Sequence, residues 1–152
     1  MLVVLDSVFN RIIRNRRLGR STWVYIDEIY LLFQHEYSAN FLFTLWKRVR
    51  KYGACCTGLT QNVDDLLQSH TARTMLANSE FLVMLNQAST DRAELARLLN
   101  ISDNQLSYIT NVDFGRGLIK CGSAIVPFMD HFPKNNLYRL MSTKPSEADA
   151  AA

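Results

Sequence analysis

The stretch WVYIDEIYLL occupies residues 23–32 and decides the fold class of this chain. With Thr22 before it, the stretch opens on TWVYI, a β-branched and aromatic run without polar alternation. Such a run is typical of a parallel strand that is covered on both faces. Two carboxylates, Asp27 and Glu28, follow directly at the carboxyl end of this strand. The stretch therefore predicts a buried strand with an acidic end.

Two more apolar runs follow further along the chain, ACCTGLT at residues 54–60 and EFLVMLN at residues 80–86. Amphipathic or helical segments precede the first run and separate the others, and we expect them at residues 2–17, 39–52 and 63–78. Apolar strands that alternate with helices predict an α/β domain with a mostly parallel sheet. Because βαβ crossovers are right-handed, we expect all three strands to point the same way.

Local signals place the ends of several elements. Ser38 is a candidate N-cap for the helix over residues 39–52, and Ser102 begins a capping-box sequence. Residues 117–128 predict a β-hairpin that turns at residues 121–123, with Pro127 marking an edge position. The small, polar residues 141–152 predict a disordered tail, which leaves residues 1–140 for the fold.

Polar side chains follow each of the three predicted strands. Ligands of open α/β sheets bind at the carboxyl ends of the strands. The candidate site therefore consists of Asp27, Glu28, Gln61, Asn62, Asn86 and Gln87. A carboxylate suits Mg²⁺, a second one can polarise a nucleophilic water, and an amide on the next strand can orient that water. This chemistry is that of nucleotide hydrolysis.

A simpler explanation exists for the acidic pair and for the basic residues further on. Asp27 and Glu28 could satisfy the free N–H groups of a helix N-terminus, which explains most isolated Asp-Glu pairs. The cations of residues 47–51 suit a helix C-terminus in the same electrostatic way. The order of the parts favours the catalytic interpretation: apolar strand, Asp-Glu, helix, basic turn, glycine, strand, Thr-Gln.

Composition excludes several classes of protein. Seventeen basic and fourteen acidic residues among 152 leave a net charge of +3, too mild to indicate nucleic-acid binding. Three cysteines without secretory context argue for a reducing, cytoplasmic compartment. His35, His70 and His131 lack metal-ligand spacing, so we expect no zinc site. We also expect no membrane-spanning segment and no signal peptide.

A resemblance to a known family is carried by WVYIDEIYLL together with two longer stretches. These are ANFLFTLWKRVRKYGACCTGLTQNVDDLL at residues 39–67 and MLANSEFLVMLNQASTDRAELARLLNIS at residues 75–102. The chain resembles the C-terminal part of the motor domain of conjugal-transfer ATPases of type IV secretion systems, in the form found on Gram-positive mobile elements. These hexameric motors of the HerA and FtsK class have a RecA-like P-loop core.

The resemblance implies a role for each matching residue. Asp27 would be the Walker B residue that holds Mg²⁺ through water, Glu28 the catalytic carboxylate, and Gln61 the sensor. Arg48 and Arg50 both lie where this class places its trans-acting arginine, and the sequence does not choose between them. Arg116, between two glycines, is a weaker candidate for a phosphate contact, because such glycines more often open a hairpin. ATP and Mg²⁺ are the implied ligands.

One motif of the family is missing. No part of the 152 residues matches GxxxxGK[ST], the loop whose backbone N–H groups cradle phosphates. In this class, the strand that leads into the phosphate-binding loop lies in the sheet between two others. These are the sensor strand and the strand that follows the sensor strand in sequence. We therefore expect an incomplete core with an exposed sheet edge beside strand 54–60, unless strand 80–86 closes onto that edge or another chain fills it. We also expect the chain alone to be inactive as an ATPase.

The resemblance also implies partners: self-association into a hexamer, other secretion subunits and DNA, at the cytoplasmic face of the membrane. Two alternatives use the same residues differently. The chain could be a non-catalytic α/β module that docks other subunits of the secretion machinery. It could also be a receiver-type domain with Asp27 as phosphoacceptor, but the further acidic residues and the late lysine of such domains are absent.

Overall fold

The computed structural model describes residues 2–61 and 63–141. The fold belongs to the predicted α/β class, and contacts divide the chain into two compact units. The first unit holds the described residues up to Ser79 together with Ser89–Asn100, and the second holds Glu80–Ala88 and the described residues from Ile101 onward. The boundary predicted at residue 140 stays a prediction, because residues 142–152 lie outside the described part of the chain.

The first unit is built around a parallel pair of strands, β1 (Thr22–Ile26) and β2 (Ala54–Gly58). Their register runs from Thr22 opposite Ala54 to Ile26 opposite Gly58. The helices are α1 (Leu2–Arg17), η1 (Ile29–Phe33), α2 (Glu36–Arg48), η2 (Val49–Tyr52), α3 (Val63–Gln68), α4 (His70–Ala77) and α5 (Ser89–Leu99). The crossover from β1 through α2 to β2 is the predicted βαβ unit.

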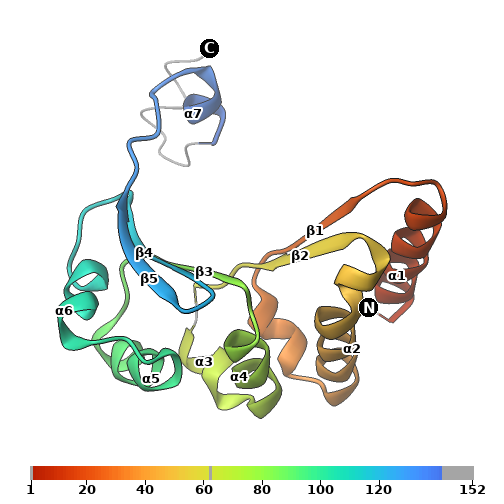
Figure 1. Cartoon of the computed structure of the whole chain (residues 1–152), viewed down its shortest axis with the longest axis horizontal. Helices are drawn as coiled ribbons and strands as arrows, with labels where there is room; N and C mark the ends of the chain where they lie inside the picture. The colour runs from red at the N-terminus through yellow and green to blue at the C-terminus, as the bar shows by residue number, and fades with distance from the viewer. Residues whose placement is uncertain (1, 62, 142–152) are drawn as a thin grey trace. The chain divides into compact units, whose positions relative to one another are not determined.

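Helices cover only one face of this strand pair (Figure 1). Val24 and Cys56 pack with Ile12 of α1 and Leu45 of α2 on that face. The opposite face carries Trp23 and Tyr25, which are 64% and 67% exposed. The prediction that β1 is covered on both faces is therefore wrong for this unit. An apolar run predicts burial, but it does not show on which faces the helices of the same unit pack.

Ser38 does not cap α2. The helix begins at Glu36, after His35, and Ser38 lies inside its first turn, fully buried. Its hydroxyl is within hydrogen-bond distance of the carbonyl oxygens of Leu32 and His35. The serine therefore fastens the end of η1 to the start of α2. The predicted end of this region at Gly53 is confirmed, with a φ of 62° that favours glycine.

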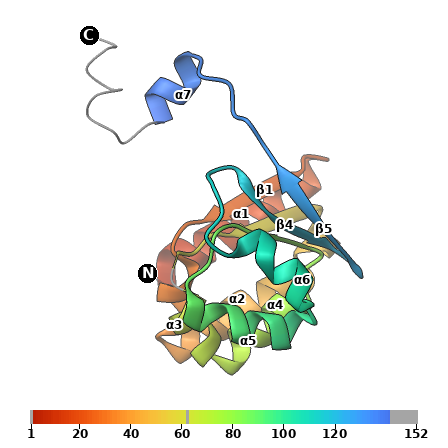
Figure 2. The same cartoon turned by 90° about the vertical axis from the view of Figure 1, so that its left-hand side faces the viewer.

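The second unit contains an antiparallel sheet of β3 (Phe81–Met84), β4 (Arg116–Cys121) and β5 (Ala124–Met129), in that order. The hairpin of β4 and β5, which Figure 2 draws in blue, is the predicted one, with Pro127 on the edge strand. The predicted single sheet is wrong, because β3 pairs with β4 rather than with β1 and β2. Gly117 permits this pairing, since a Cβ there would lie 2.2 Å from the carbonyl oxygen of Met84.

Short helices complete the second unit: α6 (Asp103–Leu106), η3 (Ser107–Ile109) and α7 (Asn136–Met141). The predicted capping box is confirmed, because Ser102 and Gln105 exchange side-chain and backbone hydrogen bonds at the start of α6. None of the helices within the described residues is long and apolar enough to span a membrane.

Candidate functional site

Asp27 and Glu28 stand where the parallel pair ends. The amide of Leu59 donates to the carbonyl of Ile26 at 2.8 Å, and the amide of Ile29 donates to the carbonyl of Leu59 at 2.9 Å. These two bonds extend the strand pairing past the acidic residues. The backbone of both carboxylates is therefore held at the carboxyl edge of the sheet, as predicted.

Gly58 allows the chain after Glu28 to pack this closely. Ile29 is buried in a core cluster with Leu42, Leu66 and Met75. A Cβ on Gly58 would lie 2.6 Å from Cδ1 of Ile29. Our sequence analysis did not single out Gly58, although a glycine inside a strand often marks a close approach of this kind. Gly58 is thus a positioning residue for the acidic end of β1.

The backbone of Glu28 adopts a left-handed conformation, with φ and ψ both at 48°. A non-glycine residue in this region stores strain, and such strain is frequent at functional sites. Glu28 precedes η1, but its side chain makes no capping hydrogen bond. Its Oε2 atom is buried without a hydrogen-bond partner. Helix capping, the simpler explanation for the acidic pair, is therefore not what Glu28 does.

Asp27 differs from its neighbour. Its side chain is exposed, and Oδ1 accepts a hydrogen bond from the Glu28 amide at 3.0 Å. Oδ2 remains available for water or a cation. Among the described residues, no group of three or more His, Cys, Asp or Glu side chains could hold a metal ion. A single carboxylate acting with water and phosphate oxygens is an ordinary way for proteins to hold Mg²⁺, so Asp27 fits that ion.

Gln61 lies at the same edge of the strand pair as the carboxylates. It follows Leu59 and Thr60 at the end of β2 and precedes α3, whose Val63 and Leu67 are buried. The side chain of Gln61 is exposed. The structure thus brings the segments of Glu28 and Gln61 to one edge, while Asn62 lies outside the described residues.

Arg48 and Arg50 lie at the opposite edge. Arg48 ends α2 and Arg50 lies in η2, shortly before β2 begins. At this amino end of the strand pair, the carbonyl of Gly53 accepts a hydrogen bond from the amide of Thr22. A strand of five residues separates this edge from the carboxylates, a distance of about 16 Å. Both arginine side chains are exposed. Neither arginine therefore lies beside Asp27 and Glu28 of its own chain.

Arg116 belongs to the second unit, where it lies 3.9 Å from Asp113 in an exposed ion pair. Its flanking glycines have a structural reason. A Cβ on Gly115 would lie 2.2 Å from the carbonyl oxygen of Asp130, and Gly117 makes room for β3. The glycines therefore reflect the hairpin, as the simpler explanation predicted.

Asn86 and Gln87 also belong to the second unit and fasten its loops. Oδ1 of Asn86 accepts from the amide of Val112 at 3.3 Å. The amide of Gln87 donates to the carbonyl of Ile109 at 2.9 Å. These hydrogen bonds give the polar end of β3 a structural role within its unit.

Comparison with known proteins places these elements in a family. The sequence model of the TraG P-loop domain matches residues 1–116, which include β1, β2, β3 and every candidate site residue. The chain belongs to the TraG P-loop domain family. This membership confirms the resemblance to motor domains of conjugal-transfer ATPases and the predicted P-loop fold class.

A solved structure is similar to this TraG P-loop domain as well. It is the structure of VirB4 of Thermoanaerobacter pseudethanolicus, with 27% sequence identity and a TM-score of 0.76. The similarity covers 86% of this chain but 36% of the VirB4 chain, so the domain spans about a third of that chain. No curated protein matches the sequence.

Proposed function

We propose that this TraG P-loop domain is the part of an ATP-hydrolysing motor that carries the Walker B carboxylates, and that the motor powers conjugative DNA transfer by type IV secretion. The observation that carries the proposal is Glu28, with its left-handed backbone and its buried, unpartnered Oε2 atom at the carboxyl edge of a parallel pair. An unpaired buried carboxylate oxygen costs free energy unless a ligand or water uses it.

Each residue at this edge has a proposed task. Glu28 accepts a hydrogen bond from the attacking water and aligns it, because its Oε2 has no other partner. Asp27 holds the water shell of Mg²⁺ through its exposed oxygen. Gln61, on the adjacent segment, orients the same water. When bound, Mg²⁺ offsets the negative charge of the ATP phosphates.

The arginines act on a neighbouring copy in this proposal. Cations gather at the amino edge of the strand pair, at residues Arg14, Arg16, Arg17, Arg20, Lys47, Arg48, Arg50 and Lys51. Carboxylates gather around the other edge, at Asp27, Glu28, Glu36, Asp64 and Asp65. Opposite charge at opposite ends favours a head-to-tail contact between copies, the kind that closes into rings. Such a contact brings Arg48 or Arg50 to the carboxylates of the next copy.

We assign the remaining features to the same motor. Arg116 is a lower-ranked candidate for a phosphate contact. A hexamer, other secretion subunits and DNA are the proposed partners, at the cytoplasmic face of the membrane. The shared family and the similarity to VirB4 support this assignment.

The first test is Glu28→Gln in a protein that joins this domain to a phosphate-binding loop. The amide keeps the shape of the side chain but cannot accept a proton from the water. We expect ATP hydrolysis to fall by about 10²–10⁴-fold while ATP affinity is kept. Glu80→Gln is the matched control, because Glu80 is an exposed carboxylate of the second unit and belongs to neither charged cluster. If hydrolysis by the Glu28→Gln protein equals that of the control, Glu28 is not the catalytic carboxylate.

The second test asks which arginine acts in trans. Arg48→Ala and Arg50→Ala are compared separately, and the variant that loses a trans-acting arginine should lose about 10³–10⁵-fold in turnover. Mixing that variant with Glu28→Gln protein should restore part of the activity, because some interfaces then join an intact arginine to an intact Glu28. Absence of recovery in mixtures that still form oligomers would contradict action in trans.

A further inference from the structure

Arg50 lies in η2, a single turn of 3₁₀ helix between α2 and β2. Side chains three residues apart eclipse one another in a 3₁₀ helix, so Val49 and Tyr52 share one face of η2. Val49 is buried, and Tyr52 packs partly buried against the same core cluster. Arg50 and Lys51, which lie between them, are exposed. Both ends of η2 are therefore anchored in the core, while its middle faces solvent.

The ring of Tyr52 has two partners on α1. It lies edge-on to the ring of Phe9, with the centroids 5.4 Å apart and the ring planes at 83°. The guanidinium carbon of Arg16 lies over the Tyr52 ring, 6.0 Å from its centroid. An edge-on ring pair and a cation over a ring are both favourable arrangements. Phe9 and Arg16 are about two helical turns apart, so they stand on the same side of α1.

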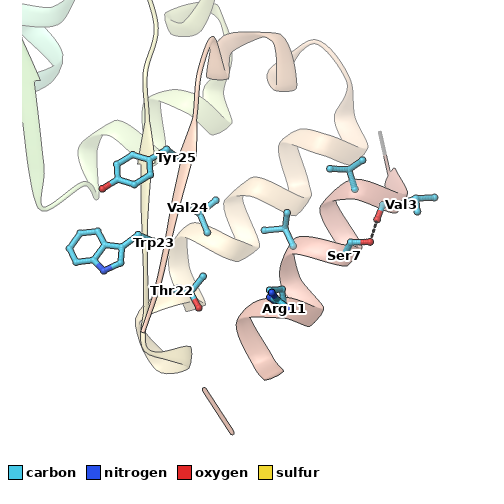
Figure 3. Close-up of a pocket in the computed structure, with 9 residues that line it drawn as sticks. Val3, Ser7, Arg11, Thr22, Trp23, Val24 and Tyr25 are labelled. Carbon is cyan, nitrogen blue, oxygen red and sulfur yellow. Dashed lines mark hydrogen bonds between the residues drawn. The ribbon is translucent and has the colours of Figure 1, made fainter. Parts of the chain in front are cut away.

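The helix that Tyr52 contacts is itself held on the strand pair. Figure 3 shows α1 beside β1, with Thr22 and Val24 pointing toward the helix. Val24 packs in the same core cluster as Ile12 of α1, and Asn15 donates a hydrogen bond to the Thr22 hydroxyl at 3.0 Å. The contact with α1 therefore fixes Tyr52 relative to the amino edge of β1 and β2.

Backbone hydrogen bonds link the position of Tyr52 to that of Arg50. The amide of Gly53, directly after Tyr52, donates to the carbonyl of Arg50 at 3.1 Å. The Tyr52 hydroxyl makes no hydrogen bond to another described residue, so the ring supplies the anchor. Arg48 differs, because it ends α2 and precedes this anchored turn.

On the basis of the proposed function, in which an arginine of the amino edge acts in trans, we propose that Tyr52 is a positioning residue for Arg50. The ring of Tyr52 fixes the backbone of η2, so that Arg50 is aimed at the phosphates bound by the neighbouring copy. A side chain on a fixed backbone loses less conformational freedom when it reaches its target. Tyr52 itself touches no phosphate.

The test uses a protein that joins this domain to a phosphate-binding loop. Tyr52→Leu removes the ring and should lower kcat for ATP hydrolysis about 10²-fold, because a displacement of about 1 Å can cost that much. KM for ATP should change by less than about twofold, because Arg50 stabilises the transition state rather than bound ATP. Tyr52→Phe keeps the ring and should keep kcat.

Phe41→Leu is the matched control for loss of an aromatic pair. The ring of Phe41 also lies edge-on to Phe9, with the centroids 6.4 Å apart, and it packs against the same core cluster. Phe41 belongs to the middle of α2 rather than to η2. Its loss should lower stability but change kcat by less than about twofold. A loss of kcat equal to that of Tyr52→Leu overturns the proposal, and so does a loss of kcat in Tyr52→Phe.

A double variant separates positioning from simple destabilisation. If Tyr52 acts through Arg50, Tyr52→Leu should cause little further loss of kcat in a protein that already carries Arg50→Ala, because the aimed group is absent. A further loss of about 10²-fold in the double variant shows that the two residues act independently and overturns the proposal.

The same variants distinguish failure of this proposal from failure of the proposed function. If Arg50→Ala lowers turnover and Tyr52→Leu does not, the arginine acts as proposed and only the role of Tyr52 is wrong. If Arg48→Ala lowers turnover and Arg50→Ala does not, the role of Tyr52 is again wrong, while the motor keeps a trans-acting arginine. If neither arginine variant loses turnover, both proposals are wrong about the arginine.

Discussion

Glu28 combines two costs at one position. A left-handed backbone at a non-glycine residue costs about 1–3 kcal/mol, and a buried carboxylate oxygen without a partner adds to that cost. Both are reasonable if the residue must present an oxygen to a ligand. These two costs at Glu28 are therefore the physical argument for its proposed catalytic role.

A second residue-scale property concerns the cysteines of β2. Burial, and to a lesser extent the neighbouring Cys55 thiol, raise the pKa of Cys56 from 9.0 to about 11. Below pH 9, the thiolate fraction of Cys56 is therefore about a hundredfold lower than in the unfolded chain. The stabilising effect of keeping this thiol protonated is fully present below pH 9 and is lost as the pH rises toward about 11.

We expect Cys56 to react slowly with iodoacetamide at pH 8 in the folded chain and readily in urea. Mass spectrometry after timed labelling measures the modification at each cysteine. Cys55 and Cys121 are exposed and serve as internal controls for access of the reagent. If Cys56 is labelled at the same rate in the folded chain and in urea, the thiol is not shielded as the structure describes.

At the scale of elements, the segment that runs from β1 through η1 to α2 positions Asp27 and Glu28. η1 follows Glu28 directly, and the Ser38 hydroxyl links the end of η1 to the first turn of α2. Ile29 fills the space that Gly58 leaves open. A substitution at Ser38 or Gly58 would therefore affect Asp27 and Glu28 by shifting the backbone, because neither residue is a proposed ligand-binding residue.

Ser38→Ala should therefore lower the free energy of unfolding by about 1–2 kcal/mol, because the carbonyls of Leu32 and His35 lose a buried donor. Urea denaturation of the chain measures this change. Ser7→Ala is the matched control, since Ser7 also donates to a helical carbonyl but is exposed; it should change stability by less than about 0.5 kcal/mol. Equal changes in the free energy of unfolding for both variants would show that the burial of Ser38 does not strengthen its contribution to stability.

At the scale of the whole molecule, the proposed function makes this chain one part of a nucleotide site. The carboxylates and Gln61 lie at one edge of β1 and β2, and no GxxxxGK[ST] sequence occurs in the 152 residues. Among the described strands, β2 pairs only with β1, so its other edge carries no strand. In the proposed motor, most phosphate contacts of the P-loop site come from residues outside these 152.

The isolated chain should show no magnesium-dependent ATP hydrolysis and weak ATP affinity at most. A coupled phosphate-release assay and calorimetric titration measure the two quantities. Glu28→Gln in the same chain is the control for contaminating ATPase, because a contaminant would be unaffected by it. Robust hydrolysis that the Glu28→Gln variant abolishes would contradict the half-site interpretation.

The sequence by itself determined the local structure. TWVYI, the amphipathic pattern of residues 2–17, Gly53 and the hairpin signals all predicted their elements, because propensity and turn chemistry depend on neighbouring residues. The three stretches that carry the resemblance also sufficed for the family. The start of α2 was misplaced, because the burial of Ser38 depends on η1, which no periodic pattern predicts.

Only the tertiary structure decided which surfaces are covered and which groups meet. Trp23 and Tyr25 read as buried from their apolar run, yet both core clusters lie on the other face of β1. The pairing of β3 with β4, rather than with β2, depends on long-range contacts. The left-handed backbone of Glu28 and its unpartnered Oε2 atom were likewise invisible in the sequence, because neither follows from a local pattern of residue types.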